Sequence, residues 1–426
     1  DDDLVALGVG VGVVSWITYL VGRAGGLWSP IFAVVGFLTV WAGWRIVWQG
    51  WQRLARSCRS LRLWKWSDLL LLGVIGWYVW HTWQLTGNPP AGWDENNSHA
   101  AMARWYADHH VISFLPWMNF NNFPMGLESL LTIESMGTRN PGDAIPYLFH
   151  LLTLPVIYLL CKNRTGGLIS CLLYLMIPAT TQYTMAMLTD PMLIFYATLL
   201  AWAVVTLPVD RSSLVLIGLM MGSLLSVKYT GILWVMLLLV LIIPISRGGL
   251  NGWKSVKPYK IITVRNTLAV ILPCLVMILP WVARNLILFG NPVFPFCASL
   301  LHICNGSIGA SLRADLVIDS GGMLEAFRVH NPWLIAWDNT MYEVGPWNFN
   351  AKPGGGGPWL LALFPFAVLS WRSLSVGLRW LVGAAVCYLL IWWWGFRLDQ
   401  TRYLLPCVPV LCATVGVGIG KLLEDK

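Results

Sequence analysis

The sequence predicts an all-α polytopic membrane protein, with about 12 transmembrane helices and two extracytoplasmic loops that carry short helices. The 426 residues are 57% hydrophobic and only 11% charged, whereas soluble domains carry roughly 25% charged residues. Mean hydropathy is +0.64. Apolar runs long enough to cross a bilayer recur along the chain, and an α-helix satisfies its own backbone hydrogen bonds in lipid. The 27 Trp residues fit anchoring at the membrane interface.

Hydropathy gives the position of each span in order. The expected spans lie at 5–22, 31–49, 68–83, 143–162, 165–181, 188–206, 212–227, 229–246, 265–288, 357–371, 376–395 and 402–420. Two long polar connections interrupt the series, at 84–142 and 289–356. The chain therefore divides into two N-terminal spans with a basic loop (1–66), a transmembrane core (67–288), the second outer loop (289–356) and C-terminal spans (357–426).

Basic residues orient these spans. One cluster lies between the second and third spans: Arg45, Arg53, Arg56, Arg59, Arg62 and Lys65. Another lies between the eighth and ninth: Arg247, Lys254, Lys257, Lys260 and Arg265. Neither cluster contains an acidic residue, which is typical of cytoplasmic loops. The two long connections are then extracytoplasmic, and the net charge of +8 needs no nucleic-acid partner, for which we find no motif.

The first outer loop carries an acidic stretch beside a membrane span. Asp94 and Glu95 are adjacent, and His99 follows them at the start of a short amphipathic helix expected over 97–109. Ser98 or Asn97 is the expected N-cap. A simple structural explanation is that carboxylates near a helix start are favoured by its dipole. The functional hypothesis is a catalytic carboxylate facing a cavity at the membrane.

Other polar residues fall on the same outer face, at the ends of later spans. They are Asp190, Lys228, Arg284, Asn285, Arg402 and Tyr403. Ionisable groups beside hydrocarbon are costly and tend to mark function, although each one alone is also explained as an interfacial anchor. Their common face predicts a shared cavity with Asp94.

The sequence also contains candidate residues for a metal site and for a disulfide. Carboxylates suit Mg²⁺ or Mn²⁺, so Asp94 and Glu95 are candidate ligands. The histidines lack the spacing of a helical zinc motif. Cys297 and Cys304 share the second outer loop, where an oxidising compartment would permit a disulfide.

Several motifs resemble those of a known superfamily. The acid pair Asp94-Glu95 is followed by His99 and Tyr106, and then by a helical continuation at 123–128. Further segments match in order: Leu188-Thr189-Asp190, Val227-Lys228-Tyr229-Thr230-Gly231, Pro280 to Asn285 with Gly290 to Pro295, and Gln400 to Pro406. Over roughly 67–420 the chain resembles polytopic glycosyltransferases of the GT-C fold, which include protein mannosyltransferases and aminoarabinose transferases.

The resemblance implies a function and roles for the residues. The chain would move a sugar from a polyprenyl-phosphate donor to an acceptor, with inversion, on the periplasmic side of a bacterial inner membrane. Asp94 would be the base, with Glu95 or Asp190 orienting the acceptor or a metal. Lys228, Arg284 and Arg402 would bind phosphate, and His99, Tyr106, Asn285 and Tyr403 would contact substrate. The expected partners are the lipid-linked sugar, membrane lipids and other membrane subunits.

Two other functions remain open from the sequence. A transporter or lipid flippase would also need carboxylates in a polar cavity, but we find no internal repeat, and the acids lie in a loop. A non-catalytic member of the same fold, serving as a structural subunit of a larger membrane complex, would use the Trp-rich surface and the two N-terminal spans to contact partners.

Overall fold

A computed structural model describes most of the helical part of the chain. The described ranges are 2–28, 65–86, 94–118, 123–138, 144–185, 187–208, 210–246, 263–294, 371–396 and 401–424, with short pieces at 30, 34, 121, 342–343, 352–353 and 365–369. Within them the only strands are β1 (Tyr342–Glu343) and β2 (Lys352–Pro353), which form one antiparallel pair.

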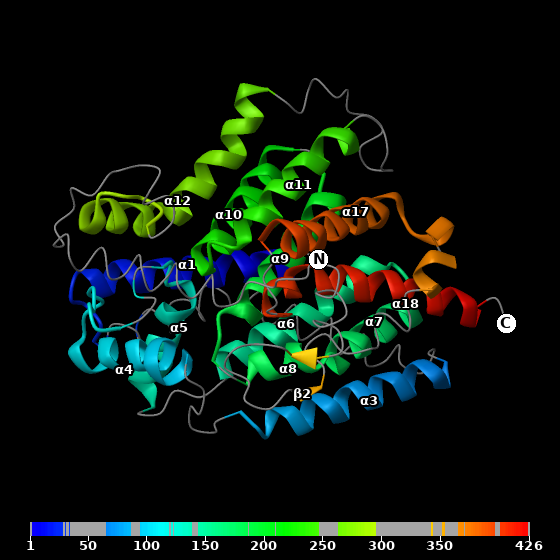
Figure 1. Cartoon of the computed structure of the whole chain (residues 1–426), viewed down its shortest axis with the longest axis horizontal. Coiled ribbons are helices and arrows are strands. Elements are labelled where there is room, and N and C mark those ends of the chain that lie inside the picture. The colour runs from blue at the N-terminus through cyan, green and yellow to red at the C-terminus, as the bar shows by residue number, and fades with distance from the viewer. Residues whose placement is uncertain are drawn as a thin grey trace.

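Helices dominate the described residues, and most of the helices outside the first outer loop are apolar (Figure 1). The α-helices outside that loop are α1 (Asp2–Arg23), α3 (Trp66–Trp83), α6 (Ala144–Cys161), α7 (Arg164–Met176), α8 (Pro178–Thr184), α9 (Asp190–Thr206), α10 (Arg211–Val227), α11 (Gly231–Ser246), α12 (Val264–Phe289), α17 (Val376–Leu390) and α18 (Val408–Glu424). The first outer loop contains η2 (Glu95–His99), α4 (Ala100–His109) and α5 (Gly126–Gly137). Short 3₁₀ or π segments are η4 (Trp371–Ser373), η5 (Ile391–Phe396) and η6 (Thr401–Cys407).

The chain is an integral membrane protein. Among the described residues, 5 helical segments are long and apolar enough to cross a membrane, and several shorter apolar helices accompany them. The expected all-α polytopic class is therefore confirmed. The expected spans at 31–49 and, for the most part, 357–371 lie outside the described residues, so the number of spans stays a prediction. The same holds for the four-part division of the chain.

One expected span is divided in two. Hydropathy alone predicts a continuous helix over 165–181, but α7 ends at Met176 and Ile177 is extended. Pro178 then begins α8. A proline disfavours helical backbone at the residue before it and suits the first turn of a new helix. The break therefore follows from Pro178, which a hydropathy average does not detect.

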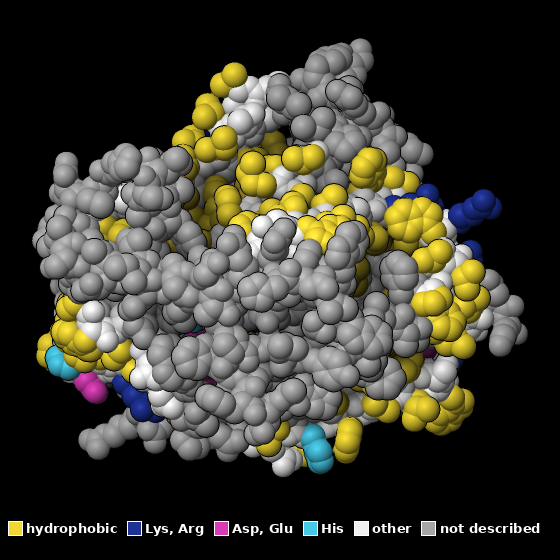
Figure 2. Space-filling model, in the orientation of Figure 1, with side chains coloured by type: hydrophobic (Ala, Val, Ile, Leu, Met, Phe, Trp, Pro, Cys, Tyr) yellow, Lys and Arg dark blue, Asp and Glu magenta, His cyan; other side chains and the backbone are white. Residues whose placement is uncertain are grey.

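The core of the molecule surrounds α9. Every residue of this helix from Asp190 to Val204 is buried, as expected for a helix that is apolar on all sides. It contacts α6, α10, α17 and η6. By contrast, α3 lies along the edge of the molecule (Figure 1) and exposes Trp66, Trp77 and Trp80. Among the described residues on the face seen in Figure 2, hydrophobic side chains outnumber charged ones, as is suitable for a surface that faces lipid.

The helix ends that carry the candidate residues gather near the first outer loop. The last turn of α1 binds this loop: Ile112 N donates to Gly22 O at 2.9 Å, and Arg23 Nη1 donates to Ile112 O at 3.0 Å. The loop also meets η6 through an ion pair between Asp94 and Arg402. One end of the bundle therefore brings the loop and the C-terminal segment together.

Candidate functional site

The acidic stretch forms an unusual turn. Glu95–His99 is π-helical, and the backbone N–H of Ala100 donates to Glu95 O, five residues back. Isolated π turns often occur at functional sites. The expected N-cap is wrong, because the Ser98 hydroxyl donates back to the carbonyl of Asp94. Glu95 is buried, whereas Asp94 at the start of the turn keeps part of its surface accessible.

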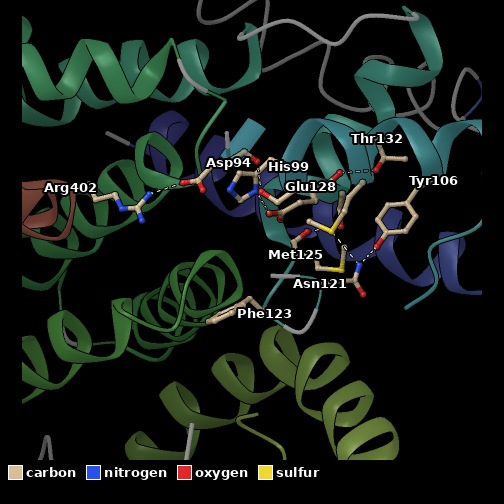
Figure 3. Close-up of polar contacts among 12 residues, drawn as sticks. Asp94, His99, Tyr106, Asn121, Phe123, Met125, Glu128, Thr132 and Arg402 are labelled. Carbon is tan, nitrogen blue, oxygen red and sulfur yellow. Dashed lines mark hydrogen bonds and ion pairs between the residues drawn. The ribbon is translucent and has the colours of Figure 1, made fainter. Parts of the chain in front are cut away.

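Asp94 forms an ion pair with the C-terminal part of the chain. Arg402 Nη1 donates to Asp94 Oδ2 at 2.9 Å, a contact drawn in Figure 3. The Arg402 side chain is 15% exposed and the Asp94 side chain is 24% exposed. The pair is therefore neither fully desolvated nor fully open to water. It joins two residues that are 308 positions apart in the sequence.

A second ion pair lies beside the first. Lys228 Nζ donates to Asp190 Oδ1 at 3.1 Å. Asp190 begins α9 and Lys228 directly follows α10. The ring of Tyr403 lies 5.2 Å from Lys228 Nζ and 5.4 Å from Arg402 Cζ, within the range of a cation–π contact. Tyr403 therefore contacts the cations of both pairs.

We call these four charged residues, Asp94, Asp190, Lys228 and Arg402, the paired-charge cluster. Both carboxylates act electrostatically on Arg402, and the four formal charges sum to zero. The Oδ2 atom of Asp190 is buried and accepts no hydrogen bond from the part of the chain that the structure describes. The cluster thus combines two neutralised cations with an acceptor oxygen that a hydroxyl could use.

His99 binds a carboxylate that the sequence analysis did not single out. Glu128, in the first turn of α5, forms a hydrogen bond through Oε1 to His99 Nδ1 at 2.6 Å. Both residues are buried. Glu128 reads in the sequence as an ordinary charge near a helix start. The signal that could have found it is its position inside α5 between apolar residues, where an acid is costly unless it has a partner.

Helix α5 is fixed tightly against its neighbours. Ser15 Oγ of α1 donates to Gly126 O at 2.7 Å. A Cβ atom at Gly126 would lie 2.6 Å from the carbonyl oxygen of Ser226, near the end of α10. Only glycine permits this approach. Because Lys228 directly follows α10, the same contact ties α5 to the helix end that carries Lys228.

Arg284 and Asn285 form a separate, buried cluster. Arg284 donates to Asn285 Oδ1 at 3.0 and 2.9 Å and to Phe123 O at 2.8 Å. Asn285 Nδ2 donates to the Tyr229 hydroxyl at 2.9 Å. The structure records no ion pair from Arg284 to the paired-charge cluster within the described residues. Its contacts fix the loop at Phe123 instead.

Tyr106 is a packing residue of the outer loop. It is fully buried, and its hydroxyl donates to Ser113 O at 3.1 Å and accepts from Asn121 Nδ2 at 2.6 Å. Asn121 also accepts from the Leu115 N–H at 3.0 Å. Burial raises the pKa of Tyr106 well above its ordinary value. Because Tyr106 is buried, it exposes no surface through which it could make the predicted contact with substrate.

The two candidate metal ligands, Asp94 and Glu95, differ in their surroundings. Asp94 Oδ2 accepts from Arg402, and Glu95 is buried. Across the described ranges, no three or more His, Cys, Asp or Glu side chains come together as a metal site. Mg²⁺ or Mn²⁺ at Asp94 and Glu95 stays a prediction. Cys297 and Cys304 lie outside the described residues.

Comparison with known proteins gives a fold and no sequence family. No family model and no curated protein matches the sequence. Two solved structures of ArnT from Cupriavidus metallidurans, one bound to undecaprenyl phosphate and one in the apo state, superpose with TM-scores of 0.54 at 16% and 17% identity. Each match covers 82% of this chain and 59% of ArnT.

A third match is the Archaeoglobus fulgidus oligosaccharyltransferase in the apo form. Its TM-score is 0.50 at 13% identity, with 83% of this chain and 51% of that protein covered. At such low identity the likeness establishes the fold alone, and the expected GT-C fold is confirmed. The chain spans between about half and three fifths of the length of these proteins.

Proposed function

We propose that this chain is a membrane glycosyltransferase that moves a sugar from a polyprenyl-phosphate donor to an acceptor, with inversion, on the periplasmic face of a bacterial inner membrane. The observation that carries the proposal is the paired-charge cluster, in which Arg402 and Lys228 lie beside one Tyr ring at the outer loop. The fold shared with ArnT, which has been solved with undecaprenyl phosphate, supports a lipid-linked donor. The surrounding apolar helices suit its lipid tail.

Arg402 and Lys228 are the proposed phosphate ligands. A guanidinium binds phosphate oxygens in a bidentate way, and an ammonium adds a compact positive charge. Each cation is paired with a carboxylate, Arg402 with Asp94 and Lys228 with Asp190. The donor phosphate would therefore replace Asp94 as the partner of Arg402. One charge pair replaces another, so no buried cation is left unpaired.

This exchange gives Asp94 its proposed role as base. Once the phosphate holds Arg402, the Asp94 carboxylate is released and accepts the proton of the incoming hydroxyl. The acceptor oxygen forms a bond to the anomeric carbon, the bond from that carbon to the phosphate oxygen breaks, and polyprenyl phosphate leaves. Arg402 and Lys228 stabilise the charge on the leaving phosphate. Asp190 Oδ2 is available to orient a sugar or acceptor hydroxyl.

Substitution of Arg402 tests the phosphate site. We expect Arg402→Gln to raise the Kd for undecaprenyl phosphate at least about 10-fold, equivalent to about 1.4 kcal/mol, and to reduce sugar transfer from a radiolabelled polyprenyl-phospho-sugar. Native mass spectrometry of purified protein in detergent measures binding. Arg379→Gln is the matched control, because Arg379 caps backbone carbonyls of Leu374 and Arg372 away from the cluster.

The outcomes separate the proposed function from its alternatives. If Arg402→Gln and Arg379→Gln bind undecaprenyl phosphate equally well, the phosphate site is elsewhere and the proposal fails. If the wild-type protein binds the carrier but transfers no sugar to any membrane acceptor, a non-catalytic subunit of the same fold becomes the better explanation. Vesicle uptake of the lipid-linked sugar without transfer would favour a flippase.

A further inference from the structure

The hydrogen bond between His99 and Glu128 determines which ring nitrogen of His99 carries the proton. When Glu128 is ionised, its carboxylate can only accept hydrogen bonds, so His99 Nδ1, at 2.6 Å from Glu128 Oε1, carries the proton. The Nε2 atom of a neutral His99 then has a free electron pair. The His99 side chain keeps 11% of its surface exposed, against 4% for Glu128. The imidazole is therefore the accessible member of the pair, and the carboxylate is the enclosed one.

The π turn relates His99 to Asp94. In a helix whose hydrogen bonds run to the fifth residue, side chains five positions apart lie about one turn apart. Asp94 and His99 have this spacing around η2. Figure 3 shows His99 between Asp94 and Glu128, in a row that begins at Arg402. With Nδ1 bound to Glu128, Nε2 lies on the side of the ring away from that carboxylate.

The second oxygen of Glu128 gives an independent reason to look for a function. Glu128 Oε2 is buried and has no hydrogen-bond partner among the residues that the structure describes. A buried, incompletely paired carboxylate costs stability. A packing role for this position would be filled at lower cost by Gln or Leu. A positive charge on His99 would offset the cost, because the imidazolium would form a charge-assisted hydrogen bond to Glu128.

We infer that Glu128 is a positioning residue for proton transfer, which acts through His99 on Asp94. Glu128 fixes His99 as the Nδ1–H form and presents Nε2 toward the turn that carries Asp94. The proton passes from the acceptor hydroxyl to Asp94 and then to His99 Nε2, so that Asp94 returns to its charged form and can bind Arg402 again. No electrons are transferred. The inference rests on the proposed function for the source of the proton.

The test uses Glu128→Gln, with Glu134→Gln on the same helix as the matched control. Glutamine has nearly the shape of glutamate, but its amide can donate as well as accept and so no longer fixes the proton on Nδ1. Solid-state NMR of ¹⁵N-histidine-labelled protein reports which nitrogen of His99 is protonated, and His99→Gln identifies the signal. Undecaprenyl phosphate binding and sugar transfer are measured on the same variants.

We expect His99 to be the Nδ1–H form in the wild type and in Glu134→Gln, and to gain the Nε2–H form in Glu128→Gln. The kcat of transfer should fall about 10- to 100-fold in Glu128→Gln, by analogy with other residues that orient a histidine, while the Kd for undecaprenyl phosphate stays within about twofold of wild type. An Nε2–H form in the wild type overturns the inference even if no transfer is found. An unchanged kcat in Glu128→Gln also overturns it. If the wild type does not bind undecaprenyl phosphate, the proposed function is refuted instead.

Discussion

Asp94 and Arg402 form an ion pair at 2.9 Å. Because Asp94 competes with the donor phosphate for Arg402, removal of its charge should have opposite effects on binding and on chemistry. We expect Asp94→Asn to lower the Kd for undecaprenyl phosphate several-fold and to reduce transfer by about 10²-fold or more, the typical contribution of a general base. Equilibrium binding and radiolabelled transfer measure the two effects.

The contrast with Arg402→Gln makes this prediction specific. Arg402→Gln should weaken both carrier binding and sugar transfer, whereas Asp94→Asn should strengthen carrier binding and weaken sugar transfer. Full transfer by Asp94→Asn would remove Asp94 from the mechanism. Weaker carrier binding by that variant would show that Asp94 does not compete with phosphate.

Single residues could be selected from the sequence, but their pairing could not. Asp94, Lys228 and Arg402 stand out because charge beside hydrocarbon is rare. Residue type and local sequence do not predict that Arg402 binds Asp94 while Arg284 binds Asn285 and Phe123. The partner depends on which helix ends meet in three dimensions.

At the scale of elements, α7 and α18 pack unusually closely. A Cβ atom at Gly416 of α18 would collide with the Ser170 hydroxyl and would lie 2.5 Å from the Gly166 carbonyl of α7. Small residues at such contacts let membrane helices approach each other. Helix α18 continues from η6, which carries Arg402, so this contact also supports the site.

Gly416→Ala should therefore destabilise the protein. We expect a loss of about 1–3 kcal/mol from overpacking, measured as a lower Tm in detergent, together with weaker carrier binding. Gly383→Ala on α17 is the control, because no atom lies within 4 Å of its added Cβ and alanine is the better helix former. Equal Tm values for the two variants would contradict the close packing of α7 against α18.

Element positions were largely predictable, and the exceptions have physical causes. The apolar runs predicted α1, α3, α6, α9, α10, α11, α12 and α17 closely. The break between α7 and α8 was visible in Pro178 but is lost in a hydropathy average. The π form of η2 was not predictable, because the buried contact of His99 with Glu128 lies outside the local sequence.

At the scale of the whole molecule, the charge pattern and the fold place the same helix ends together. Positive loops predicted which helix ends share a face, and the ends that carry Asp190, Lys228 and Arg402 do meet beside the first outer loop. The fold match to ArnT was also expected from motif order. Roles in catalysis need more than this arrangement, because one fold supports active and inactive proteins alike.

A structure of the protein with undecaprenyl phosphate, determined by cryo-electron microscopy in lipid nanodiscs, tests the central claim most directly. We expect the phosphate to contact both Arg402 and Lys228, with the hydrogen bond from Arg402 to Asp94 broken and the Asp94 carboxylate turned away. A phosphate bound elsewhere, or bound while Arg402 still holds Asp94, would contradict the account.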